Sequence, residues 1–332
     1  MTPVTVVTSD DPRDFRRRDW TRLVDADPAG TIFHTPGFLK LYWEEFGVGR
    51  LVLVSGEDTD GRQLAAAAFE VSDGTLRFLG GTEVTDYQGP VGEPGVADGF
   101  ASALWETLDG LDGWRTADLG GLVEDSAWLG SLRGSAEARG FAVEESEDRN
   151  GVAPLIDLPG DWDAYLAGLP SKLRHEIRRK AKKLEAEVGS YRVETATATT
   201  LDPLLDRFVE LHRQSEGPKG VFMVPGMEIF FRRLGEEFCE RGMFRLTFLR
   251  VADELTAGTV GFVHRGTYSL YNSAFDRRWQ HLSPGMVLVA EDIRQAIGEG
   301  CGRFDLLKGD YAYKYRFGAR RRAVRRLVVA RR

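Results

Sequence analysis

Cysteine is scarce in this sequence, and its two cysteines lie far apart. Cys239 and Cys301 share no CxxC spacing, and neither has a histidine close to it in the sequence. A disulfide framework and a structural zinc site both need closely spaced thiols, so neither is expected. The five histidines show no HExxH or HxH spacing, and no GxSxG motif is present. The sequence therefore supports neither a metal enzyme nor a covalent acyl-enzyme mechanism.

Long hydrophobic runs are also missing. The longest apolar stretches, such as residues 51–54 and 64–69, fall far short of the ~20 residues that a membrane span needs. The first residues of the chain lack the apolar core and the small-residue cleavage pattern of a signal peptide. We therefore expect no transmembrane helix and a cytoplasmic location.

Apolar residues nevertheless make up 42% of the 332 residues, which is enough for the cores of two ordinary domains. Charge is divided unevenly between the two halves. Residues 1–170 hold 13 Lys and Arg against 31 Asp and Glu, whereas residues 171–332 hold 31 against 20. Halves of opposite net charge attract each other, and the basic half suits an anionic, phosphate-bearing acyl carrier.

The second half carries a clear order of strands and one helix. Residues 244–251, 256–264 and 267–274 are rich in β-formers and are separated by short turns, which predicts three strands. An apolar helical spacing follows over residues 286–299, and residues 303–307 predict a closing strand. Strand, strand, strand, helix, strand is therefore the expected order of this half.

The start of that helix predicts a binding site for an anion. Ser283, Pro284 and Gly285 come directly before the helical spacing that begins at Met286. The first N–H groups of a helix and the positive end of its dipole attract negative charge. We therefore expect Ser283, Pro284, Gly285 and Met286 to hold the phosphates of a donor.

A strongly basic segment precedes these strands. Residues 171–183 carry seven Lys and Arg and one Glu on a thin apolar stripe, which predicts a basic helix. The charges form either a solvated face or a phosphate-binding surface. Because one basic helix without a helix-turn-helix partner or a zinc finger has little specificity, DNA recognition is not expected.

Two local patterns lie elsewhere in the chain. Thr35 and Pro36 are typical of the N-cap and first position of a helix, whose aromatic face includes Trp43. Residues 216–225 are rich in Gly and Pro and predict a flexible loop, of the kind that often covers a substrate.

Two segments resemble the Fem-like branch of the GNAT acyltransferase superfamily, which includes acyltransferases associated with cellulose or exopolysaccharide biosynthesis. DLLKGDYAYKYRFG, residues 305–318, looks like the end of these proteins. LPSKLRHEIRRKAKKLE, residues 169–185, is similar to the basic helix that opens their acyltransferase domain. With the SPG before a helix, the resemblance covers roughly residues 155–318, about half of the chain.

The resemblance implies an α/β (α+β) fold of tandem GNAT-like domains, each with a mixed, mostly antiparallel sheet flanked by helices. It places an N-terminal GNAT-like domain at residues 1–154 and the acyltransferase domain at residues 155–318. Residues 319–332 are expected to form a basic strand that returns to the first domain, where their charge complements its acids.

The resemblance also implies roles for single residues. Lys314 would stabilise charge at the reacting carbonyl. Asp305, Asp310 and Asp86 are candidates for the general base, although each could instead form an ion pair with a nearby cation. The Asp86–Tyr87 pair is similar to an element that lies near the interdomain cleft in the family. The residues expected to contact substrate are Trp43, Tyr87, Lys172, Arg174, Arg178, Tyr313 and Arg316.

The function expected from these features is N-acyl transfer. The donor would be acetyl-CoA or another acyl-CoA, the acceptor an amine on a small molecule or peptide, and transfer would be direct, within a ternary complex. The glycine-rich phosphate signature Q/RxxGxG/A is absent from HLSPGMVL. Two alternatives therefore stay open: a Fem-type transferase that uses aminoacyl-tRNA, and a non-catalytic binding protein on the same fold.

Overall fold

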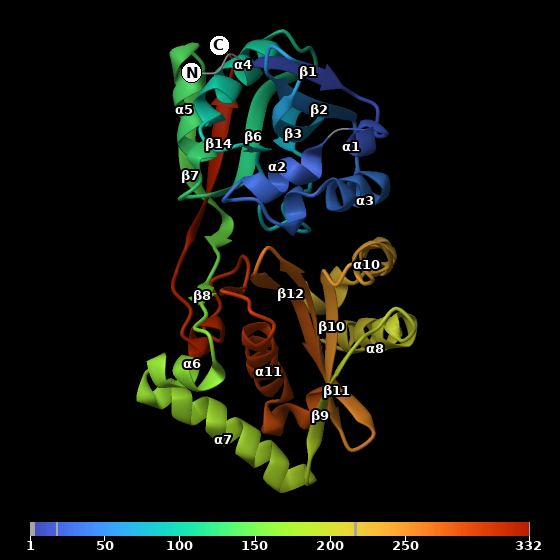
Figure 1. The fold of residues 1–332 in the computed structure, drawn as a ribbon. Helices are drawn as coiled ribbons and strands as arrows, with labels where there is room; N and C mark the ends of the chain where they lie inside the picture. Colours follow the sequence, from blue (N-terminus) through green and yellow to red (C-terminus); the bar gives the residue numbers. More distant parts are fainter. Residues whose placement is uncertain (1–3, 18, 216–217, 332) are drawn as a thin grey trace. The chain divides into compact units, whose positions relative to one another are not determined.

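The protein, seen as a computed structural model that describes residues 4–17, 19–215 and 218–331, divides into two compact units. The N-terminal unit comprises Met1–Val152 and Arg322–Arg332, and the C-terminal unit comprises Ala153–Arg321. The two units are identified by colour in Figure 1, blue to green with a red last strand for the first, and green to red for the second.

Over the described residues, the N-terminal unit contains an eight-stranded sheet in the order β1-β2-β3-β4-β6-β14-β7, with β5 paired to β3. All neighbours are antiparallel except β4 and β6, which are parallel. The strands are β1 (Thr5–Ser9), β2 (Arg50–Glu57), β3 (Gln63–Ser72), β4 (Gly74–Phe78), β5 (Val91–Gly92), β6 (Trp114–Val123), β7 (Ala142–Val152) and β14 (Ala323–Ala330).

The N-terminal unit also contains helices, some of which pack apolar side chains on the sheet. They are α1 (Asp14–Arg17), α2 (Trp20–Ala26), the 3₁₀ turn η1 (Ile32–His34), α3 (Pro36–Phe46), α4 (Ala97–Asp109) and α5 (Ala127–Ala138). Phe100 and Trp105 of α4 and Trp128 of α5 belong to one buried cluster with side chains of the sheet. The predicted start of α3 is confirmed, because the helix begins at Pro36 and the Thr35 side chain accepts a hydrogen bond from the Phe38 N–H.

The end of the chain forms strand β14, which inserts between β6 and β7 of the N-terminal unit. Its arginines meet acids and aromatic rings there. Arg326 binds both carboxylate oxygens of Asp118, at 2.5 and 2.8 Å. The guanidinium of Arg331 lies 4.0 Å from the centre of the Trp114 ring. The basic tail is thus fixed by charge as well as by strand pairing.

Over the described residues, the C-terminal unit contains a six-stranded sheet in the order β8-β13-β12-β11-β10-β9. Only β12 and β13 are parallel. The strands are β8 (Leu155–Asp157), β9 (Tyr191–Thr195), β10 (Phe244–Val251), β11 (Glu254–His264), β12 (Thr267–Phe275) and β13 (Arg303–Asp305). The helices are α6 (Trp162–Gly168), α7 (Ser171–Val188), α8 (Leu201–Arg213), α9 (Pro218–Phe222), α10 (Pro225–Phe238) and α11 (Pro284–Gly298), with 3₁₀ turns η2 (Arg277–Leu282) and η3 (Lys314–Phe317).

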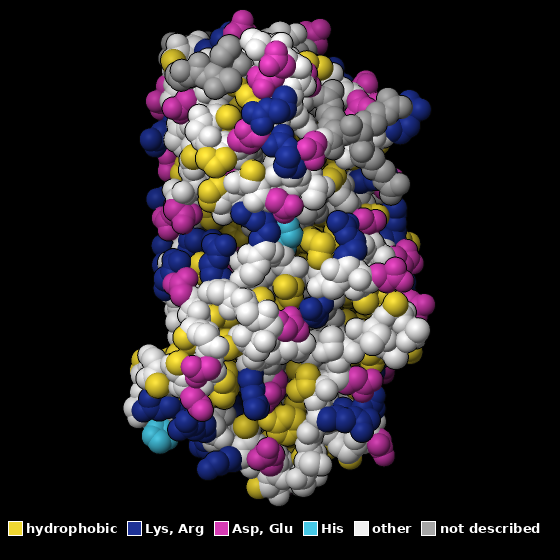
Figure 2. Space-filling model, in the orientation of Figure 1, with side chains coloured by type: hydrophobic (Ala, Val, Ile, Leu, Met, Phe, Trp, Pro, Cys, Tyr) yellow, Lys and Arg dark blue, Asp and Glu magenta, His cyan; other side chains and the backbone are white. Residues whose placement is uncertain are grey.

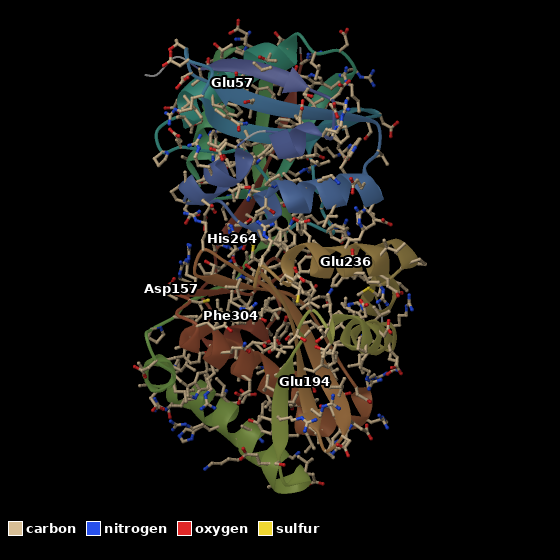
Figure 3. All side chains as sticks on the ribbon, turned by 45° about the vertical axis from the view of Figure 1, so that its right-hand side comes forward. Glu57, Asp157, Glu194, Glu236, His264 and Phe304 are labelled. Carbon is tan, nitrogen blue, oxygen red and sulfur yellow. The ribbon has the colours of Figure 1, made fainter. Side chains whose placement is uncertain are left out.

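Helices cover both faces of this second sheet. Figure 1 shows α11 on one side of the strands and α8 and α10 on the other. On the α11 side, the ring of Phe304 stacks on that of Tyr268 with centroids 4.8 Å apart, inside the unit in Figure 3. On the other side, Phe208 of α8 stacks on Phe231 of α10. At the edge strand β9, Glu194, labelled in Figure 3, accepts a hydrogen bond from Arg250 at 2.7 Å.

The predicted fold class, with mixed and mostly antiparallel sheets flanked by helices, is confirmed. Two local predictions were wrong. The closing strand ends at Asp305 rather than at residue 307, because Leu307 adopts a left-handed conformation with φ of 58°. The expected loop over residues 216–225 contains the short helix α9, although residues 216 and 217 lie outside the described part. Among the described helices, none combines enough length with enough hydropathy for a bilayer span.

Candidate active site

A pocket of about 350 Å³ lies in the C-terminal unit where α11 begins. It is bordered by the end of β12, the turn η2, the first turn of α11, one side of α7 and the segment around η3. Its lining residues are Lys180, Ser273, Phe275, Gln280, Ser283, Pro284, Gly285, Met286, Val289, Tyr313 and Arg316. The volume lies within the range of small-molecule sites in proteins.

The local sequence explains why α11 starts abruptly at this pocket. Ser283 has a left-handed backbone with φ of 56°, which turns the chain from η2 into the helix. Pro284 occupies the first helical position and has no N–H. The N–H groups of Met286 and Val287 both donate to the Ser283 carbonyl, at 3.0 and 3.2 Å. Gly285 therefore supplies the backbone N–H that remains for a ligand at this end.

The positive end of α11 is not offset by an acid of its own, since its first turn contains none. Instead, α7 brings a cation to it. The Lys180 ammonium donates a 2.8 Å hydrogen bond to the Ser283 hydroxyl. Glu176 lies beside both Lys180, at 3.9 Å, and Arg316, at 3.4 Å. Burial lowers the pKa of Lys180, and the neighbouring cations Arg179, Arg316 and Lys183 act in the same direction against the opposing effect of Glu176.

The rest of the pocket is apolar and aromatic. Phe275, Met286 and Val289 form apolar wall, and the ring of Tyr313 faces the same space. Burial raises the pKa of Tyr313 to about 12, so its hydroxyl stays protonated and can donate a hydrogen bond at neutral pH. The ring of Tyr311 stacks against that of Tyr313 with centroids 6.3 Å apart.

The segment that carries Tyr313 and Arg316 is fixed by two buried ionisable residues. Asp305 is 3% exposed, and its carboxylate accepts a 2.8 Å hydrogen bond from the N–H of Leu307, the residue with positive φ. Lys314 is also 3% exposed, and its ammonium donates to the carbonyls of Leu307 and Lys308, both at 2.8 Å. Asp305 and Lys314 thus hold the turn after β13 from two sides.

The other expected site residues of this unit lie on its surface. Asp310 is exposed and accepts a 2.5 Å hydrogen bond from the Tyr315 hydroxyl. Lys172 and Arg178 are exposed on α7. Arg174 is half-buried and donates to the carbonyls of Leu166 and Ala167 at the end of α6, at 3.4 and 3.3 Å. Figure 2 shows Lys and Arg side chains gathered over α7 at the lower left.

Three expected residues belong to the N-terminal unit. Trp43 is half-buried on α3, and Asp86 is half-buried in the segment before β5. Tyr87 is 1% exposed, and the guanidinium of Arg322 lies 4.9 Å from its ring centre and donates to its hydroxyl. The ring of Tyr87 also meets Phe33 edge to face.

The pocket therefore unites six of the expected residues: Ser283, Pro284, Gly285, Met286, Tyr313 and Arg316. Sequence reasoning missed Lys180 as a site residue, although it lay in the basic segment. It also missed Ser273 and Phe275 at the end of β12. Their position was a usable signal, because ligands of α/β sheets bind beyond the carboxyl ends of strands. Within the described part, no three His, Cys, Asp or Glu side chains come together as metal ligands.

These groups can hold an anion at one end and a narrow apolar chain at the other. A helix start, Lys180 and Arg316 suit phosphate, and the apolar wall suits an uncharged arm. Comparison with known proteins agrees with this chemistry. Residues 171–315 match the family model described as an acetyltransferase (GNAT) domain, and this range contains every residue that lines the pocket except Arg316.

This match assigns residues 171–315 to a GNAT domain. A comparison with curated proteins found no match. Among solved structures, the chain is similar to FemX, with a TM-score of 0.68 and 10% identity over 97% of this chain and 96% of that one. It is also similar to a conserved protein of unknown function from Bacteroides thetaiotaomicron VPI-5482, with a TM-score of 0.67 and 12% identity over 100% of both chains.

A third similar structure is a tandem GNAT protein from the clavulanic acid biosynthesis pathway, with a TM-score of 0.53 and 13% identity over 100% of this chain and 99% of that one. Identities this low establish the fold. The tandem GNAT-like fold expected from the sequence is thereby confirmed, and the expected resemblance to Fem-like proteins is matched by the similarity in fold to FemX. The protein is an acyltransferase in its GNAT domain.

Proposed function

We propose that the GNAT domain transfers an acyl group from an acyl-CoA, acetyl-CoA in the simplest case, to an amine. The observation that carries the proposal is the pocket at the start of α11. Its cationic rim at Lys180 and Arg316 suits the donor's phosphates, and its wall at Phe275, Met286 and Val289 suits the uncharged arm that ends in the thioester.

The transfer needs no covalent enzyme intermediate. The amine nitrogen attacks the thioester carbonyl carbon, the carbon–sulfur bond breaks, and an amide and a free thiol result. One proton leaves the amine nitrogen and one reaches the thiolate, so a base and an acid assist. Asp310 is the more accessible candidate base of the two in this unit, because it is exposed and Asp305 is buried, although both already accept a hydrogen bond. The acceptor amine could belong to a small molecule or a peptide.

The role predicted for Lys314 at the reacting carbonyl stays a prediction. Its two hydrogen bonds to Leu307 and Lys308 support a positioning role, in which it fixes the segment that carries Tyr313 and Arg316. The roles predicted for residues of the N-terminal unit, Asp86 as a base and Tyr87 and Trp43 as substrate contacts, also stay predictions.

Calorimetric titration of the full chain with acetyl-CoA tests the donor. We expect saturable binding at one site per chain, and weaker binding as salt rises, because phosphate contacts are screened. An N-acylated product should form when a panel of amines is added. A chain that binds no acyl-CoA in low salt would overturn the proposal.

A second donor, aminoacyl-tRNA, is supported by one specific observation. Lys172 and Arg178 project from α7 into solvent, where they can contact an RNA backbone. Filter binding of charged tRNA, with a steep loss of affinity between 50 and 200 mM salt, would favour this donor. Competition between tRNA and acetyl-CoA would tell whether both use the α11 pocket.

A further inference from the structure

Four cations lie at or next to the rim of the α11 pocket, with the carboxylate of Glu176 beside two of them. Lys180 and Arg316 line the pocket, and both lie beside Glu176. Arg179 and Lys183 are close enough to act electrostatically on Lys180. The group therefore carries a net charge of about +3, and the start of α11 adds roughly half a positive charge. A group of cations of this kind attracts an anion of matching charge.

A diphosphate alone does not balance this charge. A nucleotide-linked diphosphate diester carries about two negative charges, which the start of α11, Lys180 and Arg316 can accommodate. Arg179 and Lys183 then have no part of the diphosphate to bind. Lys183 donates to a neutral acceptor, the carbonyl of His281, at 2.8 Å. Arg179 is exposed and has no carboxylate at ion-pair distance among the described side chains.

The positions of these cations define a second binding point next to the first. Lys180 bonds Ser283 and Lys183 bonds His281, so the two side chains lie over neighbouring parts of the turn that leads into α11. Residues three or four apart on a helix have Cβ atoms about 5–6 Å apart. Arg179 and Lys183 are four apart, and Lys180 and Lys183 three apart. Two phosphate groups on one nucleotide can therefore be bound side by side along this face of α7.

We propose that Arg179 and Lys183 form a second phosphate site, which binds a phosphomonoester on the ribose of the nucleotide donor. The inference rests on the proposed acyl-CoA function, and it names the part of the donor that these two residues bind. A phosphomonoester carries up to two negative charges at pH 7, with a second pKa near 6. It places up to two negative charges on one group opposite two neighbouring cations, whereas a phosphodiester offers one. The second phosphate site therefore favours coenzyme A over acyl carriers whose phosphate groups are all diesters.

The test compares acetyl-CoA with acetyl-3′-dephospho-CoA by calorimetry on the full chain at pH 7.5. We expect the first to bind about tenfold more tightly, which corresponds to ~1.4 kcal/mol. The double variant Arg179→Ala/Lys183→Gln should bind both donors equally, with an affinity close to that of the unmodified chain for the dephospho donor. Lowering the pH to 5.5 should reduce the preference in the unmodified chain, because the phosphomonoester gains a proton.

Lys182→Ala is the matched control. Lys182 is an exposed lysine of the same helix, but it lies about 100° around the helix axis from Lys183. The Lys182→Ala variant should still bind acetyl-CoA about tenfold more tightly than acetyl-3′-dephospho-CoA. Arg179→Ala alone leaves the contact between Lys183 and His281 intact, so it separates charge recognition from any local change at the turn.

The outcomes separate the two proposals. If the unmodified chain binds both donors equally well, the second site is wrong while the proposed donor stands. If the double variant keeps the preference, the second site is also wrong. If neither donor binds, the proposed function of the pocket fails and this inference fails with it.

Discussion

Each unit contains a helix that connects two parallel strands, and the two helices begin very differently. In the N-terminal unit the path is β4, α4, β6, and in the C-terminal unit it is β12, α11, β13. The start of α4 has an acid in its first turn, Asp98, and its N-cap residue, Val96, is buried. The start of α11 has no acid there, and it borders the pocket.

The connections explain the difference. Residues 79–96 link β4 to α4 and fold back into the unit as a packed segment. Within it, the Thr85 hydroxyl bonds the Gly80 carbonyl at 2.6 Å, and the Gln88 N–H bonds the Gly121 carbonyl at 3.0 Å. Residues 276–283 link β12 to α11 by the single turn η2, which leaves open space beside the helix. The same crossover therefore borders filled core in one unit and an open pocket in the other.

The largest effect is expected from a mutation that removes a buried hydrogen-bond acceptor beside the packed residues 79–96 of the N-terminal unit. Asp27 of the N-terminal unit is 4% exposed and accepts hydrogen bonds from the Trp128 indole, at 2.7 Å, and from the Gly92 N–H, at 3.0 Å. Asp27→Ala leaves both donors buried without this acceptor and should lower the free energy of unfolding by about 3 kcal/mol. Urea denaturation followed by circular dichroism measures the loss.

Asp27→Asn is the matched control, because it keeps one side-chain oxygen as an acceptor and should cost less. Acetyl-CoA affinity at 15 °C, where the folded state is favoured, should be unchanged in both variants. A chain with Asp27→Ala that is as stable as the unmodified protein would contradict the view that polar groups hold this unit's interior together.

At the α11 pocket of the C-terminal unit, Lys180→Glu should have the next largest effect. The change places a second carboxylate beside Glu176 and removes the cation that reaches Ser283. Because the new charge repels phosphate, acetyl-CoA affinity should fall by about 100-fold. Lys182→Glu on the outer side of α7 changes the net charge equally and should cost less than threefold at 150 mM salt. Equal losses in the two variants would indicate a general charge effect rather than a site.

Much of the fold followed from local sequence patterns. Strand β10 has the predicted bounds, and α3 begins as predicted, where the Thr35 side chain accepts a hydrogen bond from the Phe38 N–H. These features depend on neighbours in the chain, so pattern and capping rules find them. The six pocket residues found in advance also came from one helix start and one short motif.

The missed features depend on contacts between distant residues. Lys180 becomes a site residue only because α7 packs beside the start of α11, 103 positions along the chain. The positive φ of Leu307, which ends β13 early, accompanies side-chain contacts from Asp305 and Lys314, two and seven positions away, which strand patterns do not encode. No periodicity in the sequence encodes such pairings, since tertiary contacts set them.

A third difference between the helices should appear in the pH dependence of stability. The buried face of α4 is apolar, from Phe100 to Leu108, whereas that of α11 contains Asp292, which is 1% exposed. Burial raises the pKa of Asp292 to about 8 and outweighs the opposite effect of the Thr259 hydroxyl. Between about pH 4 and pH 8 the unfolded chain ionises this group while the folded chain keeps it protonated. Its contribution to stability is therefore complete below pH 4 and is lost as the pH rises towards 8, at about 1.4 kcal/mol per pH unit.

Asp292→Asn removes this titration. The free energy of unfolding of the unmodified chain should fall by about 1.4 kcal/mol relative to the variant between pH 6 and pH 7. Urea titrations at the two pH values measure the difference. Parallel pH curves for the two proteins would show that Asp292 is ionised in the folded state.

The smallest effect concerns the backbone at the start of α11. A Cβ atom added at Gly285 would meet Phe275 of the pocket wall at 3.6 Å, an ordinary contact distance. Gly285→Ala should therefore stabilise the helix by up to ~1 kcal/mol and narrow the pocket, so that acetyl-CoA affinity falls by about threefold. Gly298→Ala, at the far end of the same helix, meets no described atom within 4 Å and should leave affinity unchanged. If Gly285→Ala does not weaken donor binding while Lys180→Glu does, the donor's phosphates lie on the α7 side of the pocket rather than on the helix start.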